Sequence, residues 1–204
     1  MFRWSWIEGN HDVIAQQLVQ HIELTGGALG FGMTIAFPLA LAARRWPRLH
    51  GPALGLAGVA FTIPSLALFI LLIPFTGLSM ATSLIGLTLY TLLILFRNTV
   101  AAFDGVPSDV VEAARAMGYT RTRRLLTVEL PLALPVIMAG IRIATVTALI
   151  GQGGLGQLFI TGFTLQFPTP LLVGFVLSVA LAVAADLALA GVLGWLTPWR
   201  RGRA

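Results

Sequence analysis

Few residues of this chain could do chemistry within an apolar environment, and two of them are charged. Arg142 and Asp186 each lie inside a long hydrophobic run. A lone charge at membrane depth costs on the order of 2.5–3.5 kcal/mol on insertion scales, so such residues are normally paired or functional. The simplest arrangement is an ion pair between them that holds two helices together. The alternative is a role in moving a substrate or a proton, but one carboxylate and one arginine do not make a relay.

A second candidate group is Thr62, Pro64 and Ser65, within the stretch FTIPSLALFILLIPF. A proline inside a helix removes the hydrogen-bond donor for the carbonyl four residues earlier. Within a membrane that carbonyl needs another partner in the protein or in water. The two hydroxyls are therefore candidates for lining a solute pathway. The alternative is a packing kink whose carbonyl groups are satisfied locally.

Other kinds of site lack the residues that they require. The chain contains no cysteine, which excludes disulfides and thiolate metal sites, and its histidines, His11, His21 and His50, lack the spacing of metal ligands. It contains no lysine, so it has no P-loop for ATP. Serines and threonines of the apolar runs have no nearby His and Asp to activate them. We expect a non-catalytic chain without metal or cofactor. Any ATP hydrolysis would take place on another chain.

These residues must be positioned by helices that cross a bilayer. The chain is 57% hydrophobic and 10% charged, against ~25% charged residues in soluble domains. Its apolar runs approach the ~20 residues of a helical span; they cover 24–43, 52–73, 78–97, 134–151 and 169–196. We predict an all-α polytopic membrane protein with about five spans, with an outer N-terminal segment 1–23 and a transmembrane domain 24–204. Gly26 and Gly30, four residues apart, predict close helix packing.

The arginines predict how the chain is oriented. Eleven of the 13 arginines form three clusters, which follow the first run, lie in or before the segment 104–133, and follow the last run. They are Arg44, Arg45 and Arg48; Arg97, Arg115, Arg121, Arg123 and Arg124; and Arg200, Arg201 and Arg203. With five spans all three clusters fall on one face, which the positive-inside rule makes cytoplasmic. The N-terminus is then outside and the C-terminus inside, and the net charge of +5 reflects topology and not nucleic-acid binding.

The segment 104–133 is the most polar part of the chain. It predicts a helix with Ser108 as N-cap and Asp109 near the positive end, and Gly118 ends this helix before a second, arginine-rich one. Small and flexible side chains recur on one face with helical spacing; they are Val110, Ala113, Ala114 and Met117. Such a narrow face suits docking into a groove of a partner. A helix that rests on lipid headgroups is the alternative, which spacing alone leaves open.

The same segment resembles the EAA loop of ABC importer permeases, Glu-Ala-Ala-x3-Gly-x9-Ile-x-Leu-Pro. The matching positions are Glu112, Ala113, Ala114, Gly118, Val128 in place of Ile, Leu130 and Pro131. The stretches TIPSLALFILLIP, FRNTVAAFDGVP, LPLALPVIMAGIR and ALIGQGGLGQ further resemble the osmoprotectant branch of these permeases, and the likeness covers nearly the whole chain.

The resemblance implies a type I importer (MetI-like) fold in a bacterial or archaeal inner membrane. Two permeases, as a homo- or heterodimer, would each dock one copy of a cytoplasmic ATPase through the EAA loop. An external binding protein would deliver glycine betaine, choline or carnitine and supply most of the selectivity. Closure of the ATPases would switch the permeases between inward- and outward-facing states.

Three alternatives remain beside this interpretation. A permease for another small solute, such as an amino acid, would share the EAA loop. A secondary transporter would need inverted repeats or coupled carboxylates, and a purely structural scaffold would not need a docking loop. One stretch departs from the family: fewer residues separate AGIRIATV from TALIGQGGLG, so the fourth span is expected to be ~17 residues, the minimum for crossing.

Overall fold

The computed structural model describes residues 2–149 and 153–199, which form helices and no strand. In chain order the helices are α1 (Trp4–Gly9), α2 (His11–Arg45), η1 (Pro47–Leu49), α3 (His50–Thr62), α4 (Ser65–Thr76), α5 (Met80–Asp104), α6 (Ser108–Ala116), α7 (Arg121–Arg124), η2 (Leu125–Glu129), α8 (Leu130–Leu149), α9 (Gly156–Thr164) and α10 (Pro168–Leu196). Within the described ranges four helices are long and apolar enough to span a membrane, and η1 and α3 together with α4 meet the same criterion only as a bent pair. The predicted all-α fold is confirmed.

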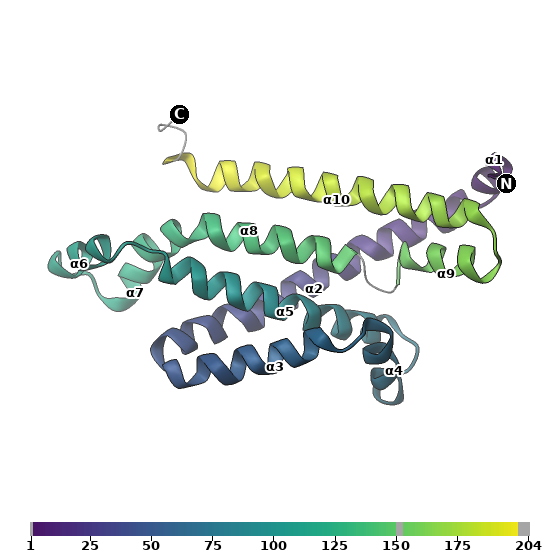
Figure 1. Cartoon of the computed structure of the whole chain (residues 1–204). Helices are drawn as coiled ribbons and strands as arrows, with labels where there is room; N and C mark the ends of the chain where they lie inside the picture. Colours follow the sequence, from purple (N-terminus) through teal and green to yellow (C-terminus); the bar gives the residue numbers. More distant parts are fainter. Residues whose placement is uncertain (1, 150–152, 200–204) are drawn as a thin grey trace.

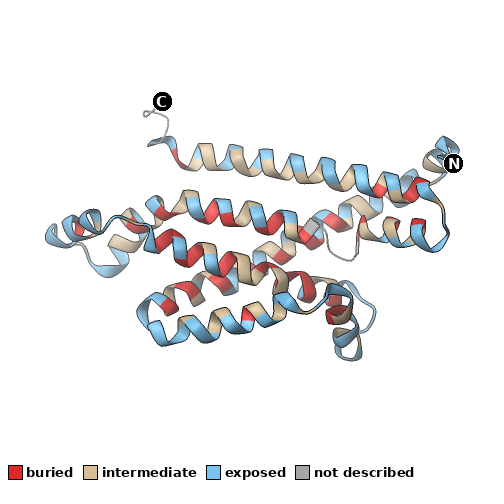
Figure 2. Cartoon of the chain, viewed as in Figure 1, coloured by how far each residue is buried: buried red, intermediate tan, exposed pale blue. Residues whose placement is uncertain are grey.

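The core lies where α5 packs between α2 and α8. Helix α5 contacts both of these helices and also α3 and α4, whereas α10 packs against α8 and α9 (Figure 1). Phe96 and Phe103 of α5 are fully buried, and alanines such as Ala36 and Ala40 of α2 face this core. The buried residues therefore gather on the facing sides of α2, α5 and α8, while α10 is exposed along most of its length (Figure 2).

Glycines bring these core helices together, but not the glycines that the sequence suggested. A Cβ at Gly32 would lie 2.7 Å from the Thr91 hydroxyl, and one at Gly140 would lie 2.4 Å from Cβ of Asn98. Both positions therefore let a neighbouring helix approach closely. Gly26 and Gly30 face open space within this chain. Within this chain the pair therefore makes no close helix contact, because glycine spacing does not reveal which side of a helix meets its neighbour.

The run 52–73 does not form one straight span. Helix α3 ends at Thr62, and α4 starts at Ser65 after a bend of 99°. Ile63 is extended, with φ −64° and ψ 127°, because a following proline disfavours the helical conformation. Pro64 is thus the N-cap of α4 and not an interior helix residue, which corrects the sequence prediction. The Tyr90 hydroxyl donates to the carbonyl oxygen of Ile63, so this carbonyl at the break has a hydrogen-bond partner within the protein.

Two helices are longer than the sequence suggested. Helix α2 begins at His11, so residues 11–23 of the predicted N-terminal segment continue the first span. Residues Arg121–Ala148 form one helical stretch of 28 residues, which is ~42 Å long at 1.5 Å per residue. The expectation of a minimal fourth span is therefore wrong, because helical structure continues back through Leu130 and Pro131 into the polar segment.

The first residues of the chain are attached to the start of the last helix. The backbone N–H of Arg3 donates to the Thr169 hydroxyl at 3.0 Å, and Thr169 is fully buried. The rings of Trp6 and Phe167 meet edge to face at 5.9 Å. Helix α1 therefore packs beside the junction of α9 and α10 (Figure 1).

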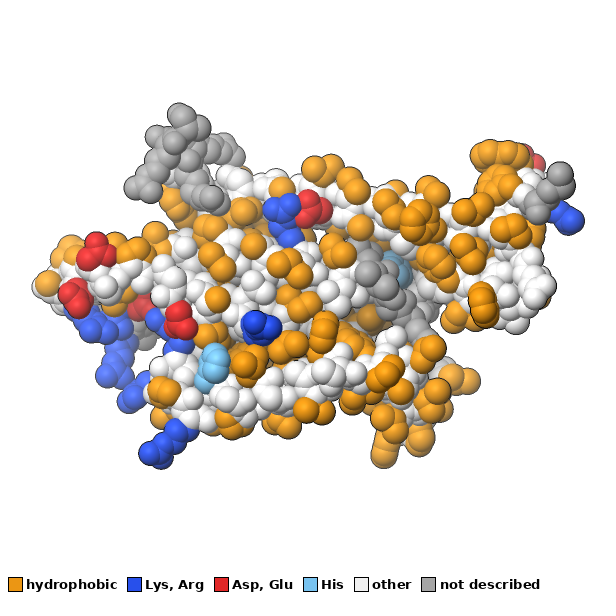
Figure 3. Space-filling model, viewed as in Figure 1, with side chains coloured by type: hydrophobic (Ala, Val, Ile, Leu, Met, Phe, Trp, Pro, Cys, Tyr) orange, Lys and Arg blue, Asp and Glu red, His pale blue; other side chains and the backbone are white. Residues whose placement is uncertain are grey.

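Basic side chains gather at one end of the molecule, which we call the arginine-rich end. It comprises the end of α2, η1, α6 and α7, with Arg44, Arg45, Arg48, Arg115, Arg121, Arg123 and Arg124. In Figure 3 the blue side chains cluster there, on the left, while α1, α4 and α9 lie toward the opposite end. Arg200, Arg201 and Arg203, the third predicted cluster, lie outside the described residues.

Candidate functional site

The helix that carries the Glu-Ala-Ala motif is α6, which spans Ser108–Ala116. Its N-cap is Pro107, and no side chain caps it. The prediction of Ser108 as N-cap is wrong by one residue because Pro107, with φ −56° and ψ 130°, already places Ser108 in the helix. Asp109 does lie in the first turn, where a carboxylate interacts favourably with the helix dipole.

Gly118 forms the turn after α6 in the way its residue type predicts. Its φ is +77°, a conformation that favours glycine. Its N–H donates to the Arg115 carbonyl at 2.9 Å, and the Tyr119 N–H donates to the Ala114 carbonyl at 3.1 Å. This is the Schellman pattern that ends many helices. The Thr120 hydroxyl then accepts from the Arg123 N–H and caps α7.

The two sides of α6 have different environments. Ala114 is buried, with 1% of its surface exposed, on the side of α6 that meets α7 and η2. Ala113 and Glu112 are exposed, as are Val110 and Met117 at 36% and 66%. Of the predicted docking face, Ala114 therefore belongs to the loop's own packing. The other three residues remain free for contact.

The return of the loop to the membrane passes through a π-helical segment, Leu125–Glu129. The N–H of Leu130 donates to the Leu125 carbonyl, five residues back. Pro131 has no N–H, so the ordinary helical ladder is interrupted at this point in any case. Val128, Leu130 and Pro131 are half-buried and shape this return. Single π turns inside α-helices are frequent at functional sites.

Glu129, at the end of the π segment, is the centre of a charge network that sequence reasoning missed. Its carboxylate accepts from Arg44 Nη1 at 2.9 Å and from Arg124 Nε at 2.7 Å, and its side chain is only 5% exposed. Arg44 Nε also lies 3.7 Å from Asp104 Oδ1. Glu129 could have been found as an acidic residue directly before Leu130-Pro131, at the start of an apolar run. No pattern in the sequence indicated its partner Arg44, 85 residues away.

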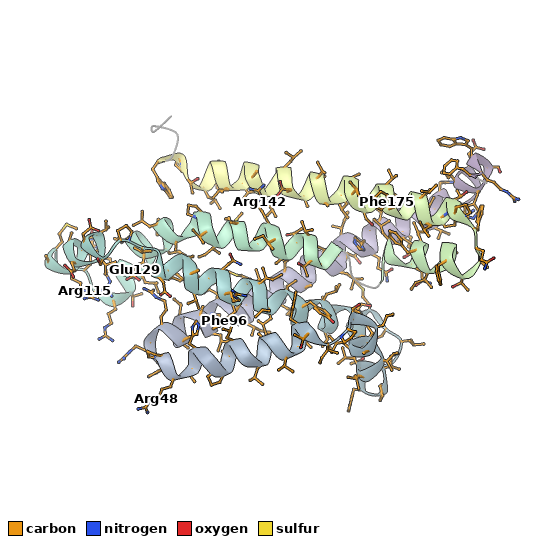
Figure 4. The ribbon with its side chains drawn as sticks, in the orientation of Figure 1. Arg48, Phe96, Arg115, Glu129, Arg142 and Phe175 are labelled. Carbon is orange, nitrogen blue, oxygen red and sulfur yellow. The ribbon has the colours of Figure 1, made fainter. Side chains whose placement is uncertain are left out.

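Arg142 and Asp186 are paired, as their positions suggested. Arg142 donates from Nε to Asp186 Oδ1 at 2.5 Å and from Nη2 to Oδ2 at 2.6 Å, which joins α8 to α10. Figure 4 shows Arg142 on the side of α8 that faces α10. The two side chains are 37% and 39% exposed in the single chain. The bidentate geometry is the strong form of an arginine–carboxylate contact.

The candidate pathway residues lie on the surface of the single chain. Thr62, Pro64 and Ser65 are all exposed, and the Thr62 hydroxyl donates locally to the Val59 carbonyl at 2.8 Å. A polar hollow of about 260 Å³ lies elsewhere, toward the opposite end, with Gln20 and Thr82 among its lining residues. The local hydrogen bond of Thr62 is what the packing alternative expects, and a pathway role for the three residues stays a prediction.

Comparisons with known proteins give the chain its relatives. It is 34% identical to the carnitine transport permease protein OpuCB of Listeria monocytogenes over 94% of this chain and 91% of that protein. It is 37% identical to the osmoprotectant import permease protein OsmW of Salmonella typhimurium, covering 93% and 94%. It is 32% identical to the choline transport system permease protein OpuBB of Bacillus subtilis, covering 95% and 93%.

Solved structures share the fold at lower identity. A chain of the MetNI methionine ABC transporter in an inward-facing conformation superposes with a TM-score of 0.80 at 22% identity, covering 93% of this chain and 99% of that one. An amino acid ABC transporter solved with histidines gives 0.67 at 16% identity, covering 97% and 99%. Residues 28–199 match the family described as binding-protein-dependent transport system inner membrane component. With the helical fold, the Gly118 turn and these relatives together, the chain belongs to the inner-membrane components of binding-protein-dependent transport systems.

Proposed function

We propose that this chain is the permease subunit of an ATP-driven importer for a small quaternary-ammonium osmoprotectant such as glycine betaine, choline or carnitine. The observation that carries the proposal is the similarity, at 31–37% identity over more than 90% of the chain, to permeases named for carnitine, choline and osmoprotectants. The chain itself supplies the membrane path by alternating access. ATP is hydrolysed on a separate ATPase.

The ATPase docks on α6. Val110, Ala113 and Met117 are exposed on a short helix in which Ala114 alone is buried, and Gly118 fixes the end of that helix. A small apolar helix face of this kind fits a groove on a partner protein. Two ATPase copies serve a dimer of permeases, and an external binding protein delivers the solute at the opposite end of the molecule.

The orientation follows from the same arrangement. The arginine-rich end carries α6 and faces the cytoplasm, in agreement with the excess of arginine expected there. The N-terminal helix α1 lies toward the other end and faces outward (Figure 1). Cysteine accessibility on the two sides of the membrane tests this assignment, because the chain contains no cysteine of its own.

The subunit acts as a conduit with little affinity of its own. A quaternary ammonium is bound tightly by an aromatic cage or a compensating charge. The Tyr90 hydroxyl is engaged by the Ile63 carbonyl, and Trp4 and Trp195 are 72% and 76% exposed at the ends of the chain. Asp186 is already neutralised by Arg142. Selectivity therefore rests with the binding protein.

Uptake by the assembled importer tests the proposal. The permease is reconstituted with its ATPase and binding protein in vesicles, and ATP-dependent uptake of labelled glycine betaine, choline and carnitine is measured, with methionine and histidine as comparison solutes. We expect uptake of at least one quaternary ammonium and none of the amino acids. Uptake of an amino acid alone would assign the chain to the alternative class of solute, and uptake without ATP would indicate a secondary transporter.

A further inference from the structure

The network around Glu129 joins parts of the chain that are far apart in sequence. Arg124 belongs to α7, within the polar segment that carries α6. Arg44 belongs to the last turn of α2, the first long helix. The carboxylate of Glu129 accepts a charge-assisted hydrogen bond from each, at 2.7 Å from Arg124 Nε and 2.9 Å from Arg44 Nη1. One side chain thus bridges the docking loop and the membrane bundle.

Arg44 extends the connection to the core helix α5. Its guanidinium lies 4.9 Å from the centre of the Phe103 ring and 3.7 Å from the carboxylate of Asp104. Phe103 is 1% exposed and belongs to the buried core beside α8. A guanidinium over an aromatic face is attracted by the ring. The ends of α2 and α5 are therefore held together by the same arginine that holds Glu129.

Because Glu129 is buried, the loss of only one of its two arginine partners is unfavourable. A carboxylate that is 5% exposed has lost nearly all contact with water and depends on its two partners. If the loop moved away from α2, either Glu129 would lose Arg44 or Arg124 would lose Glu129. Both changes would leave a desolvated charge with half of its partners. A joint movement of the loop and the helix ends keeps every contact.

The local backbone would otherwise allow the loop to move independently. Gly118 lies in a left-handed turn, and the π segment Leu125–Glu129 interrupts the regular helical ladder just before Pro131. Both features are places where a helix bends easily. Glu129 lies directly at the second of them (Figure 4). Its charge contacts oppose bending at that point.

We infer that Glu129 is the positioning residue that transmits movement of the docking helix to α2 and α5. The inference rests on the proposed function, in which an ATPase pushes on α6. With Glu129 in place, displacement of α6 carries the ends of α2 and α5 with it. Without its charge, the loop pivots at the π segment, and the work of ATP hydrolysis is no longer delivered to the helices that form the core.

The first test measures how much solute is imported for each ATP hydrolysed. Glu129→Gln keeps the shape of the side chain and removes its charge. We expect the complex to assemble and hydrolyse ATP but to import about tenfold less solute per ATP, a typical size for coupling between two sites. Glu23→Gln is the matched control, because it makes the same change at an exposed residue of α2 outside the network around Glu129, and it should keep the wild-type ratio. A wild-type ratio in Glu129→Gln would overturn the inference.

The second test measures the link between loop and bundle without any solute. The chain has no cysteine, so Arg48→Cys and Arg115→Cys introduce two unique sites for spin labels, one beyond the end of α2 and one on α6 (Figure 4). We expect a narrow distribution of distances between the labels in the otherwise wild-type chain and in Glu23→Gln. In Glu129→Gln the distribution should broaden.

A further variant keeps the test decisive if Glu129→Gln does not fold. Arg124→Gln leaves the Arg44–Glu129 contact in place and releases the loop side only, so it should also broaden the distribution. Equal widths in wild type and in Arg124→Gln would refute the bridge. If the wild-type importer carries no quaternary ammonium, the proposed substrate is wrong, while the label distances still decide the role of Glu129.

Discussion

The two ends of the molecule are stabilised by different kinds of contact. At the arginine-rich end, Glu129 is held by Arg44 and Arg124, and charged groups supply the contacts between distant segments. At the opposite end, two loops are held by hydrogen bonds between neutral groups. The Thr82 hydroxyl donates to the Gly77 carbonyl at 2.6 Å, and the Gly154 N–H donates to the Gln20 side chain at 3.3 Å.

Steric fit also matters more at the opposite end. A Cβ at Gly154 would lie 2.6 Å from the backbone of His21, and Gly154 has a φ of +53°. His21 is buried, and its Nδ1 lies 3.4 Å from the Gly153 carbonyl oxygen. Close backbone contact thus fixes the loop after α8 to α2. Charged contacts are strong and directional, whereas close packing restrains neighbouring segments through steric contact.

The largest effect is expected at the turn after α6. Gly118→Val places a β-branched residue at a φ of +77°, which costs roughly 1–3 kcal/mol of local strain. The docking helix should lose its fixed end, and uptake should fall by more than about tenfold, through release of the ATPase or loss of coupling. Copurification of the ATPase and ATP-dependent uptake are the measurements. Gly30→Ala, with open space around its Cβ, is the control. Wild-type uptake with the ATPase bound would refute the docking assignment.

A substitution at the opposite end should act on stability first. In Gly154→Ala the new Cβ would lie 2.6 Å from the His21 backbone, which would have to move away. Overpacking of this kind costs about 1–3 kcal/mol. We expect a lower midpoint of thermal unfolding in detergent and less assembled protein. The ratio of solute imported to ATP hydrolysed should be normal for the protein that does assemble. A normal midpoint with a changed ratio would place a coupling element at this end and remove the contrast between the ends.

The Arg142–Asp186 pair connects α8 and α10 between the two ends and should have a smaller effect. Each single change, Arg142→Gln or Asp186→Asn, should lower the stability of the protein in detergent, because it leaves the other charge without its partner. The double change should recover part of the loss, since neither charge is then left alone. Unfolding in detergent measures all three variants. If Asp186→Asn folds normally and transport alone is lost, the pair is functional and not structural.

The smallest signal is expected for direct binding of solute to the permease. Calorimetry on the purified subunit without its binding protein should detect weak or no binding of glycine betaine, choline or carnitine. The hydroxyl of Tyr90 in α5 donates to the Ile63 carbonyl, so it is already engaged within the protein. Micromolar binding that is lost on substitution of Tyr90 or Trp195 would contradict the conduit and favour a receptor site in the membrane.

Features determined by local sequence were predicted well. Apolar runs identified the helices because a bilayer requires long stretches without charge. Gly118 predicted a left-handed turn because glycine adopts positive φ at little cost. The pairing of Arg142 with Asp186 followed from the cost of lone charges at membrane depth. Each of these inferences needs only the chain itself and its solvent.

Features that depend on distant contacts were decided by the tertiary structure. The 99° bend at Ile63 and Pro64 was read as a kink within one span, because a proline does not specify how far a helix turns. Helical structure through Pro131 lengthened the fourth span. The partner of Glu129 lies 85 residues away in α2, and the neighbour of Gly154 is His21. Such contacts arise from the packing of whole helices, which hydropathy and local spacing do not encode.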